Sequence, residues 1–140
     1  MSLFRHVTPI QIRFADIDPM NHVNNAKYLT YIESARIRYF DDVLKRGMNA
    51  RPGFILAKAT VDFLLPITLH DEIKVMTRCS RFGSKSFDLD YEIIKVNASP
   101  ERIAAKAMTV LVAYDYAEKK TVLIPAEWKK MIEDYEQRKF

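Results

Sequence analysis

Residues 24–46 read NNAKYLTYIESARIRYFDDVLKR, and this stretch decides the fold. Its apolar side chains recur every three or four positions, at Tyr28, Ile32, Ala35, Tyr39 and Val43. That spacing predicts an amphipathic helix with one buried face. Asn24 or Asn25 can cap the start of this helix, and Gly47 is a suitable stop. A helix of about 20 residues is roughly 30 Å long, so it needs a partner surface of similar length.

Segments on both sides of this helix alternate apolar and polar residues, which is strand spacing. Before the helix we expect a strand over residues 7–17, with Ile10, Ile12 and Phe14 on its buried face. After the helix, the pattern predicts strands over residues 54–65, 72–81, 86–96 and 103–114, and a short extension over residues 121–124. Residues 103–114 are apolar on both faces, which places that strand inside the sheet.

Pro125 opens a second, shorter helix over residues 126–137. Its inward-facing residues are expected to be Trp128, Met131, Ile132 and Tyr135.

The order of these elements predicts an α+β fold in one domain over residues 1–140. Short connections favour antiparallel neighbours. A sheet with one apolar face must cover it, and residues 24–46 form the only long amphipathic element. A ten-residue strand is about 33 Å long, so strand and helix match in length. We expect a curved antiparallel sheet of five to six strands wrapped around one long helix, plus a short C-terminal helix.

Composition excludes several functional classes. The three glycines, Gly47, Gly53 and Gly83, are too far apart for a glycine-rich nucleotide-binding motif or a nucleophile elbow. A single cysteine, Cys79, allows no intrachain disulfide and no cysteine metal cluster, and its pattern predicts a buried thiol. The three histidines lack the spacing of metal ligands. We therefore expect no metal.

Charge and hydropathy point to a cytoplasmic protein that binds neither membranes nor nucleic acid. No apolar run approaches the roughly 18 residues that span a bilayer, and the start of the chain lacks the pattern of a secretory signal. The net charge of +4 suits a phosphorylated ligand or an acidic carrier protein, but the basic residues are dispersed, which disfavours duplex nucleic acid.

Residues 13–28, RFADIDPMNHVNNAKY, carry the candidate chemistry. They join a strand to the start of the long helix, where unpaired N–H groups can stabilise a developing oxyanion. A carboxylate there, Asp16 or Asp18, could attack an acyl carbon or activate water. Asp and Asn are also common turn formers and helix caps, and residue types alone favour that structural interpretation.

The same stretch resembles the opening motif of the hotdog-fold acyl-CoA thioesterases, the 4-hydroxybenzoyl-CoA thioesterase-like family. The matching residues are Phe14-Ala15-Asp16-Ile17-Asp18-Pro19, His22-Val23-Asn24-Asn25 and Tyr28. The His-Val-Asn-Asn form also resembles acyl-carrier-protein thioesterases. Weaker matches extend the resemblance over roughly residues 6–126, at Val61-Asp62-Phe63, Pro66, Asp71, Gly83, Lys85-Ser86 and Ile124-Pro125.

The resemblance implies roles for individual residues. Asp18 matches the catalytic carboxylate, acting as nucleophile or as general base. Asn25 falls where a backbone N–H polarises the thioester carbonyl, and Asn24 and His22 border the same pocket and orient water or Asp18. Asp16 is interpreted as structural, bonding N–H groups of the loop.

Further residues are assigned to the substrate. Those expected to contact the CoA phosphates and adenosine are Arg81, Ser84, Lys85 and Ser86, although a solvated hairpin turn explains them equally well. Val23 and Tyr28 are expected to line the acyl channel. In this family the site lies between two subunits, and an exposed sheet edge needs pairing, so we expect a homodimer or a homotetramer.

The leading hypothesis is an acyl-CoA thioesterase that forms a free acid and CoA, with no cofactor beyond the CoA of the substrate. One alternative is an acyl-carrier-protein thioesterase, favoured by the basic residues Arg51, Arg78 and Arg81. Another is a non-catalytic module that binds acyl thioesters. The sequence does not fix the identity or length of the acyl group.

Overall fold

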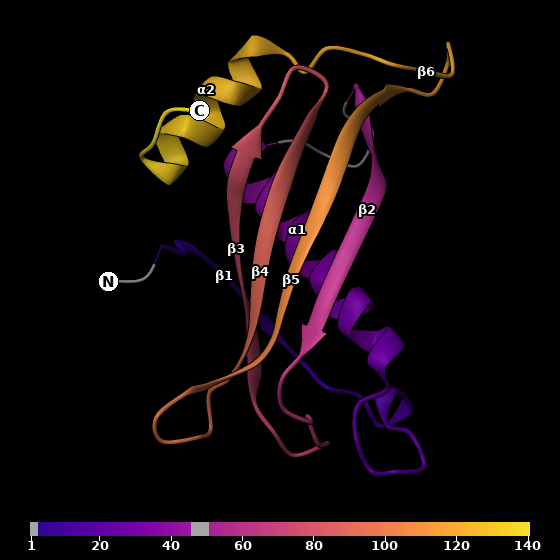
Figure 1. The fold of residues 1–140 in the computed structure, drawn as a ribbon, viewed down its shortest axis with the longest axis vertical. Coiled ribbons are helices and arrows are strands. Elements are labelled where there is room, and N and C mark those ends of the chain that lie inside the picture. The colour runs from indigo at the N-terminus through magenta and orange to yellow at the C-terminus, as the bar shows by residue number, and fades with distance from the viewer. Residues whose placement is uncertain (1–2, 46–50) are drawn as a thin grey trace.

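Within residues 3–45 and 51–140, which the computed structural model describes, six strands form one antiparallel sheet (Figure 1). The strand order is β1-β3-β4-β5-β2, and β6 pairs with β5. The elements are β1 (His6–Ile10), a 3-10 turn η1 (Phe14–Asp16), α1 (Asn25–Leu44), β2 (Gly53–Phe63), β3 (Ile73–Phe82), β4 (Ser86–Lys95), β5 (Arg102–Asp115), β6 (Lys120–Thr121) and α2 (Ala126–Glu136). The predicted α+β architecture is confirmed, including the internal position of β5.

Helix α1 forms as its sequence predicts. The side chain of Asn24 caps it by accepting a hydrogen bond from the N–H of Ala26 at 2.9 Å. The predicted stripe is buried, together with Tyr31 and Leu44. The helix ends at Leu44, and Lys45 caps it in the left-handed conformation with φ 54°. Gly47, the predicted stop, lies outside the described residues.

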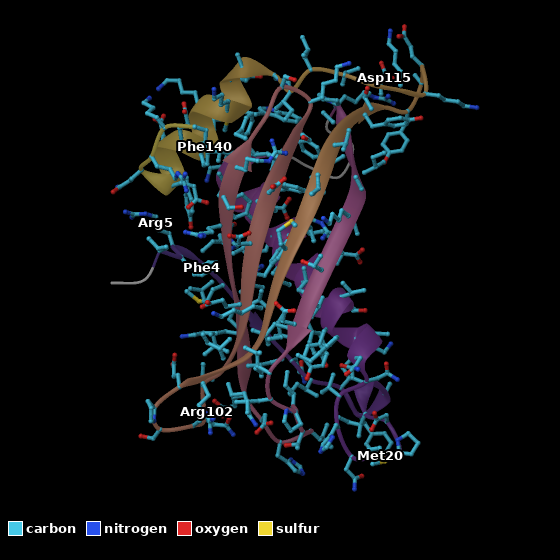
Figure 2. The ribbon with its side chains drawn as sticks, in the orientation of Figure 1. Phe4, Arg5, Met20, Arg102, Asp115 and Phe140 are labelled. Carbon is cyan, nitrogen blue, oxygen red and sulfur yellow. The ribbon has the colours of Figure 1, made fainter. Side chains whose placement is uncertain are left out.

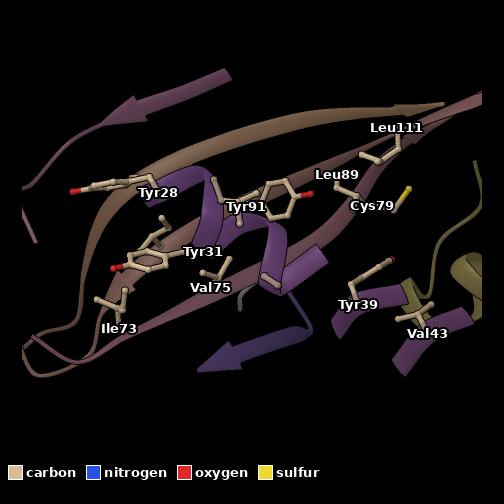
Figure 3. Close-up of a cluster of buried hydrophobic side chains, with 14 of the residues drawn as sticks. Tyr28, Tyr31, Tyr39, Val43, Ile73, Val75, Cys79, Leu89, Tyr91 and Leu111 are labelled. Carbon is tan, nitrogen blue, oxygen red and sulfur yellow. The ribbon is translucent and has the colours of Figure 1, made fainter. Parts of the chain in front are cut away.

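The core lies between α1 and one face of the sheet. Figure 3 shows tyrosines of α1 facing side chains of the central strands, among them Val75, Leu89 and Tyr91. Alternate residues of β3 and β4 are buried, as the period of two requires. Among the described strands, the edge strands β1 and β2 each pair with one neighbour, β3 and β5 respectively.

The strand expected over residues 7–17 is wrong in its second half. Strand β1 ends at Ile10, and Phe14 is 82% exposed rather than buried. The cause is local: the N–H of Arg13 donates to the Asp16 carboxylate at 3.0 Å, and the N–H of Asp16 donates to the Arg13 carbonyl at 2.9 Å. These bonds close the turn η1 and direct Phe14 outward. The final extension is also shorter than expected, because β6 covers only Lys120–Thr121.

Helix α2 packs beside the end of β3 and the C-terminal part of α1. Trp128 and Ile132 are buried as expected, whereas Met131 and Tyr135 are half-buried. In the described part of the chain, no helix is long and apolar enough to cross a membrane.

Candidate active site

The loop before α1 is a tight hairpin that fixes the position of Asp18. Ile17 and Val23 form an antiparallel bridge at its base. Within it, the N–H of Asp18 donates to the carbonyl of His22 at 2.9 Å, and the N–H of Asn21 donates to the carbonyl of Asp18 at 3.0 Å. Asn21 has φ 65°, a left-handed conformation that Asn tolerates better than most residues. Figure 2 shows the tip, at Met20, beside the N-terminal end of α1.

The carboxylate of Asp18 is held by one of its two oxygens. Its Oδ1 accepts hydrogen bonds from the N–H groups of Met20, at 2.9 Å, and His22, at 3.3 Å. Across residues 3–45 and 51–140, no donor contacts Oδ2, and the side chain is half-buried. Asp18 therefore has a fixed orientation and an oxygen with lone pairs available for chemistry.

The start of α1 supplies donors at the same end of the fold. The N–H of Asn24 donates to the Asp16 carbonyl at 2.9 Å, which ties the loop to the helix. The N–H of Asn25, the first residue of the helix, has no acceptor in the described part of the chain. Helix termini leave such N–H groups unpaired and carry partial positive charge. An oxyanion beside Asn25 would be stabilised.

Asp16 has a different environment from Asp18. It is 1% exposed and accepts hydrogen bonds from the N–H of Arg13 at 3.0 Å, from Arg13 Nη2 at 3.1 Å and from the Tyr31 hydroxyl at 2.7 Å. Burial raises the pKa of Asp16, but the bonds from Tyr31 and Arg13 outweigh it, so the pKa lies below its ordinary value. Burial and the Asp16 carboxylate raise the pKa of Tyr31. Asp16 thus holds the loop.

The sequence does not predict the hydrogen bond between the Tyr31 hydroxyl and the Asp16 carboxylate. The position of Tyr31 beside the buried stripe of α1 indicates that its side chain is buried. A buried tyrosine hydroxyl needs a polar partner. The spacing of apolar residues does not identify which residue that partner is.

The loop and the start of α1 are anchored to the segment after β2. The N–H of Val23 donates to the carbonyl of Ile67 at 2.7 Å, and the Tyr28 hydroxyl donates to the carbonyl of Leu65 at 3.5 Å. The Tyr28 ring packs edge-on against Phe63, with centroids 4.9 Å apart. Val23 and Tyr28 are each 2% exposed. Both therefore pack in the core at the edge of the candidate site.

The residues expected to bind CoA lie elsewhere. The turn between β3 and β4, which carries Ser84 and Lys85, is at the opposite end of the sheet from the Met20 loop (Figures 1 and 2). Arg81 donates to both carboxylate oxygens of Asp88, at 3.0 and 3.1 Å, and to the Ser86 hydroxyl at 3.1 Å. The hydrogen bond with Asp88 raises the pKa of Arg81.

One chain therefore assembles part of the predicted site. It brings Asp18, His22, Val23, Asn24, Asn25 and Tyr28 together at the start of α1. It places Arg81, Ser84, Lys85 and Ser86 at the far end of the sheet. Among the described residues, no group of three or more His, Cys, Asp or Glu side chains is arranged to hold a metal ion.

Comparisons with known proteins agree with this geometry. The chain matches the thioesterase-like superfamily over residues 12–132. A crystal structure of a thioesterase from Thermus thermophilus, complexed with coenzyme A and Zn, superposes with a TM-score of 0.86 and 32% identity, covering 100% of both chains.

Two sequence relatives are more distant. The long-chain acyl-CoA thioesterase FadM of Escherichia coli (strain K12) is 25% identical over 90% of this chain and 96% of its own length. The uncharacterized protein YsmA of Bacillus subtilis (strain 168) is 27% identical over 63% of this chain, a match that spans 60% of YsmA. Because the superfamily match covers most of the chain and the fold agrees throughout, the chain belongs to the thioesterase-like superfamily and is a hotdog-fold thioesterase.

Proposed function

We propose that this protein hydrolyses acyl-CoA thioesters to a free carboxylic acid and CoA. The observation that carries the proposal is that two groups lie at the same end of the fold. Asp18 has one carboxylate oxygen with no donor, and the N–H of Asn25 at the start of α1 has no acceptor, within the described part of the chain. The similarity to FadM and to a thioesterase complexed with coenzyme A supports CoA as the leaving group.

The chemistry follows from these two groups. The N–H of Asn25 donates to the thioester oxygen, whose negative charge grows as the carbonyl is attacked; one such donor is worth about 2.7–4 kcal/mol. Asp18 either removes a proton from the attacking water or attacks the carbonyl itself, and water then hydrolyses the resulting anhydride. The C–S bond breaks and CoA leaves as a thiolate that takes up a proton. No cofactor is required, and CoA is part of the substrate.

We further propose that the working unit is a homodimer, or a tetramer built from two dimers. Among the described strands, β2 is an edge that pairs only with β5, and its Leu56 and Phe63 side chains are each 48% exposed. If two copies pair antiparallel along β2, the β3–β4 turn of one approaches the Met20 loop of the other. Arg81, Ser84, Lys85 and Ser86 would then reach the CoA of a substrate held at the partner's Asp18. A cytoplasmic location remains a prediction.

Replacing Asp18 with Asn tests the proposal. Asp18→Asn keeps an oxygen that can accept from Met20 and His22 but removes the negative charge, so we expect the fold to persist and kcat to fall about 10²–10⁴-fold. Thiol release should be measured on a panel from acetyl-CoA to palmitoyl-CoA, including an aromatic acyl-CoA. Asp134→Asn on the exposed face of α2 is the matched control. Full activity in Asp18→Asn would remove this residue from the mechanism.

The two alternatives receive less support from the contacts. Basic residues favour acyl-carrier-protein recognition, but Arg81 is paired with Asp88, and Arg78 Nη2 lies 3.2 Å from Asp90. Faster release from acyl carrier protein than from acyl-CoA at physiological salt would restore that hypothesis. Tight acyl-CoA binding without turnover over hours would identify a non-catalytic module.

A further inference from the structure

The segment that follows β2, residues 64–71, holds the start of α1 in place. The carbonyl of Ile67 accepts a hydrogen bond from the N–H of Val23 at 2.7 Å. Val23 directly precedes Asn24, the cap of α1, and Asn25, whose N–H has no acceptor in the described part of the chain. A shift of Ile67 is therefore passed within two residues of Val23 to the proposed oxyanion donor.

Lys95, the last residue of β4, fixes that segment to the sheet. Its Nζ donates to the carbonyl of Pro66 at 3.1 Å and lies 3.1 Å from Asp71 Oδ2. The Lys95 and Asp71 side chains are only 20% and 14% exposed, so salt screens this ion pair less than a pair on the open surface. One ammonium group thus joins the two sides of the turn that carries Ile67, at the same end of the sheet as the loop before α1 (Figure 1).

Asp71 closes the same turn from within. Its carboxylate accepts a hydrogen bond from the N–H of Thr68 at 2.8 Å, and its own N–H donates to the Thr68 carbonyl at 3.1 Å. Burial raises the pKa of Asp71, but the hydrogen bonds from Thr68 and Lys95 outweigh it, so the pKa lies below its ordinary value. Asp71 is therefore ionised at neutral pH, and its carboxylate holds both Thr68 and Lys95.

We propose that Lys95 and Asp71 are positioning residues for thioester hydrolysis. They hold residues 66–71 in one arrangement, which keeps the N–H of Asn25 aimed at the thioester oxygen beside Asp18. They act through the backbone rather than on the substrate, and the inference rests on the proposed function. A misplacement of about 1 Å at a reacting group can cost about 10²-fold in rate. Loosening this turn should therefore lower kcat.

Steady-state hydrolysis of acyl-CoA by Lys95→Met and Asp71→Asn tests this assignment, well below the melting temperature of each variant. Each should lower kcat at least tenfold while KM stays within twofold, and the double variant should lose little more, because both changes break one link. Lys74→Met is the matched control: Lys74 pairs with Glu101 at 3.2 Å and, among the described residues, makes no hydrogen bond or ion pair with residues 64–71. A raised KM with unchanged kcat, an unchanged kcat, or an equal fall of kcat in Lys74→Met overturns the proposal.

Amide hydrogen exchange separates this inference from the proposed function, because it needs no substrate. Lys95→Met should speed exchange of the Val23 N–H at least tenfold, whereas Lys74→Met should leave it unchanged. The amide of Leu111, a buried residue of β5, is the internal reference and should keep its rate in both variants.

Two exchange results refute the positioning role. One is an unchanged rate for Val23 in Lys95→Met, and the other is an equal acceleration of Leu111, which would show a general loss of stability. If the original protein hydrolyses no acyl-CoA while Val23 exchanges faster in Lys95→Met, the proposed function fails and the link from Lys95 to the start of α1 stands.

Discussion

Among single residues, Asp16 contributes most to holding the loop before α1. Its buried carboxylate accepts three hydrogen bonds, and its carbonyl accepts a fourth from Asn24. Asp16→Asn replaces one acceptor oxygen with an NH₂ group that faces donors. Hydrogen bonds to charged groups contribute about 1.5–3 kcal/mol each, so we expect the free energy of unfolding to fall by about 2–4 kcal/mol. Urea unfolding measures this.

Tyr31→Phe is the matched control for Asp16, because it removes one donor and leaves the carboxylate with Arg13. Its cost should be smaller, about 1–2 kcal/mol. If both variants unfold at the urea concentration of the original protein, Asp16 does not hold the loop.

The lowered pKa of Asp16 also predicts how stability depends on pH. A carboxyl group whose pKa is lower in the folded state binds its proton more weakly there than in the unfolded chain. The stabilisation is therefore complete well above the ordinary value of 3.8 and is lost as the pH falls through the lower, folded pKa. Melting temperatures measured from pH 6 to pH 2 should fall less steeply for Asp16→Asn than for the original protein. Parallel curves would contradict this.

Among the secondary-structure elements, α2 supplies a hydrogen-bond acceptor to β3 at a position beyond the end of β1. The pairing of β1 with β3 ends at His6 and Thr77, so Cys79, which pairs with Leu89 of β4, has no opposing residue on the β1 side among the described residues. Instead its N–H donates to Glu136 Oε2 at 2.7 Å, and the same oxygen accepts the Tyr39 hydroxyl at 2.6 Å. The carboxylate of α2 thus links the edge of the sheet to α1.

This link predicts the reactivity of the thiol. Burial, with the nearby negative charge of Glu136, raises the pKa of Cys79 to about 12, so little thiolate forms near pH 8. Cys79 should resist thiol reagents in the folded protein and react fully in denaturant. Glu136→Gln weakens the docking of α2 and should accelerate labelling, whereas Glu127→Gln at the exposed start of α2 should not. Equal labelling rates in the two variants would show that Glu136 does not anchor the helix.

These elements also show what the sequence could predict. Stripes such as Tyr28, Ile32 and Ala35 identify α1 because local periodicity reports burial directly. Phe14 continued the alternation of the preceding strand, yet two bonds between Arg13 and Asp16 turned the chain there. Glu136, about 100 residues along the chain from its partner Tyr39, carries no local signal of burial.

The sequence likewise indicates the position of some residues of the candidate site and not of others. Residues from Asp18 to Asn25 lie together at one helix end, which the sequence indicates because a loop and the helix that follows it must adjoin. Arg81 and Lys85 lie beyond the reach of that loop within one chain, at the opposite end of the sheet. In the proposed dimer, their relation to Asp18 would be set by a second copy, which no pattern in a single sequence can position.

For the chain as a unit, the proposed dimer makes the completeness of the site depend on the edge at β2, which pairs only with β5 among the described strands. An unpaired strand exposes N–H and C=O groups that pair readily with another strand. Strand β2 has 11 residues and carries Leu56 and Phe63, both half exposed. Apolar side chains beside a free edge favour burial against an identical edge related by a twofold axis.

Leu56→Lys tests this arrangement, because twofold symmetry would place the new charge in the contact twice. We expect the mass measured by light scattering to fall to that of a 16.3 kDa monomer at micromolar concentration. Acyl-CoA hydrolysis should fall with it, since Asp18 would lose the β3–β4 turn of the second copy. Leu123→Lys, at another exposed leucine, should change neither mass nor activity. An active monomer would show that one chain suffices for catalysis. An intact dimer would show that a surface other than β2 forms the contact between subunits.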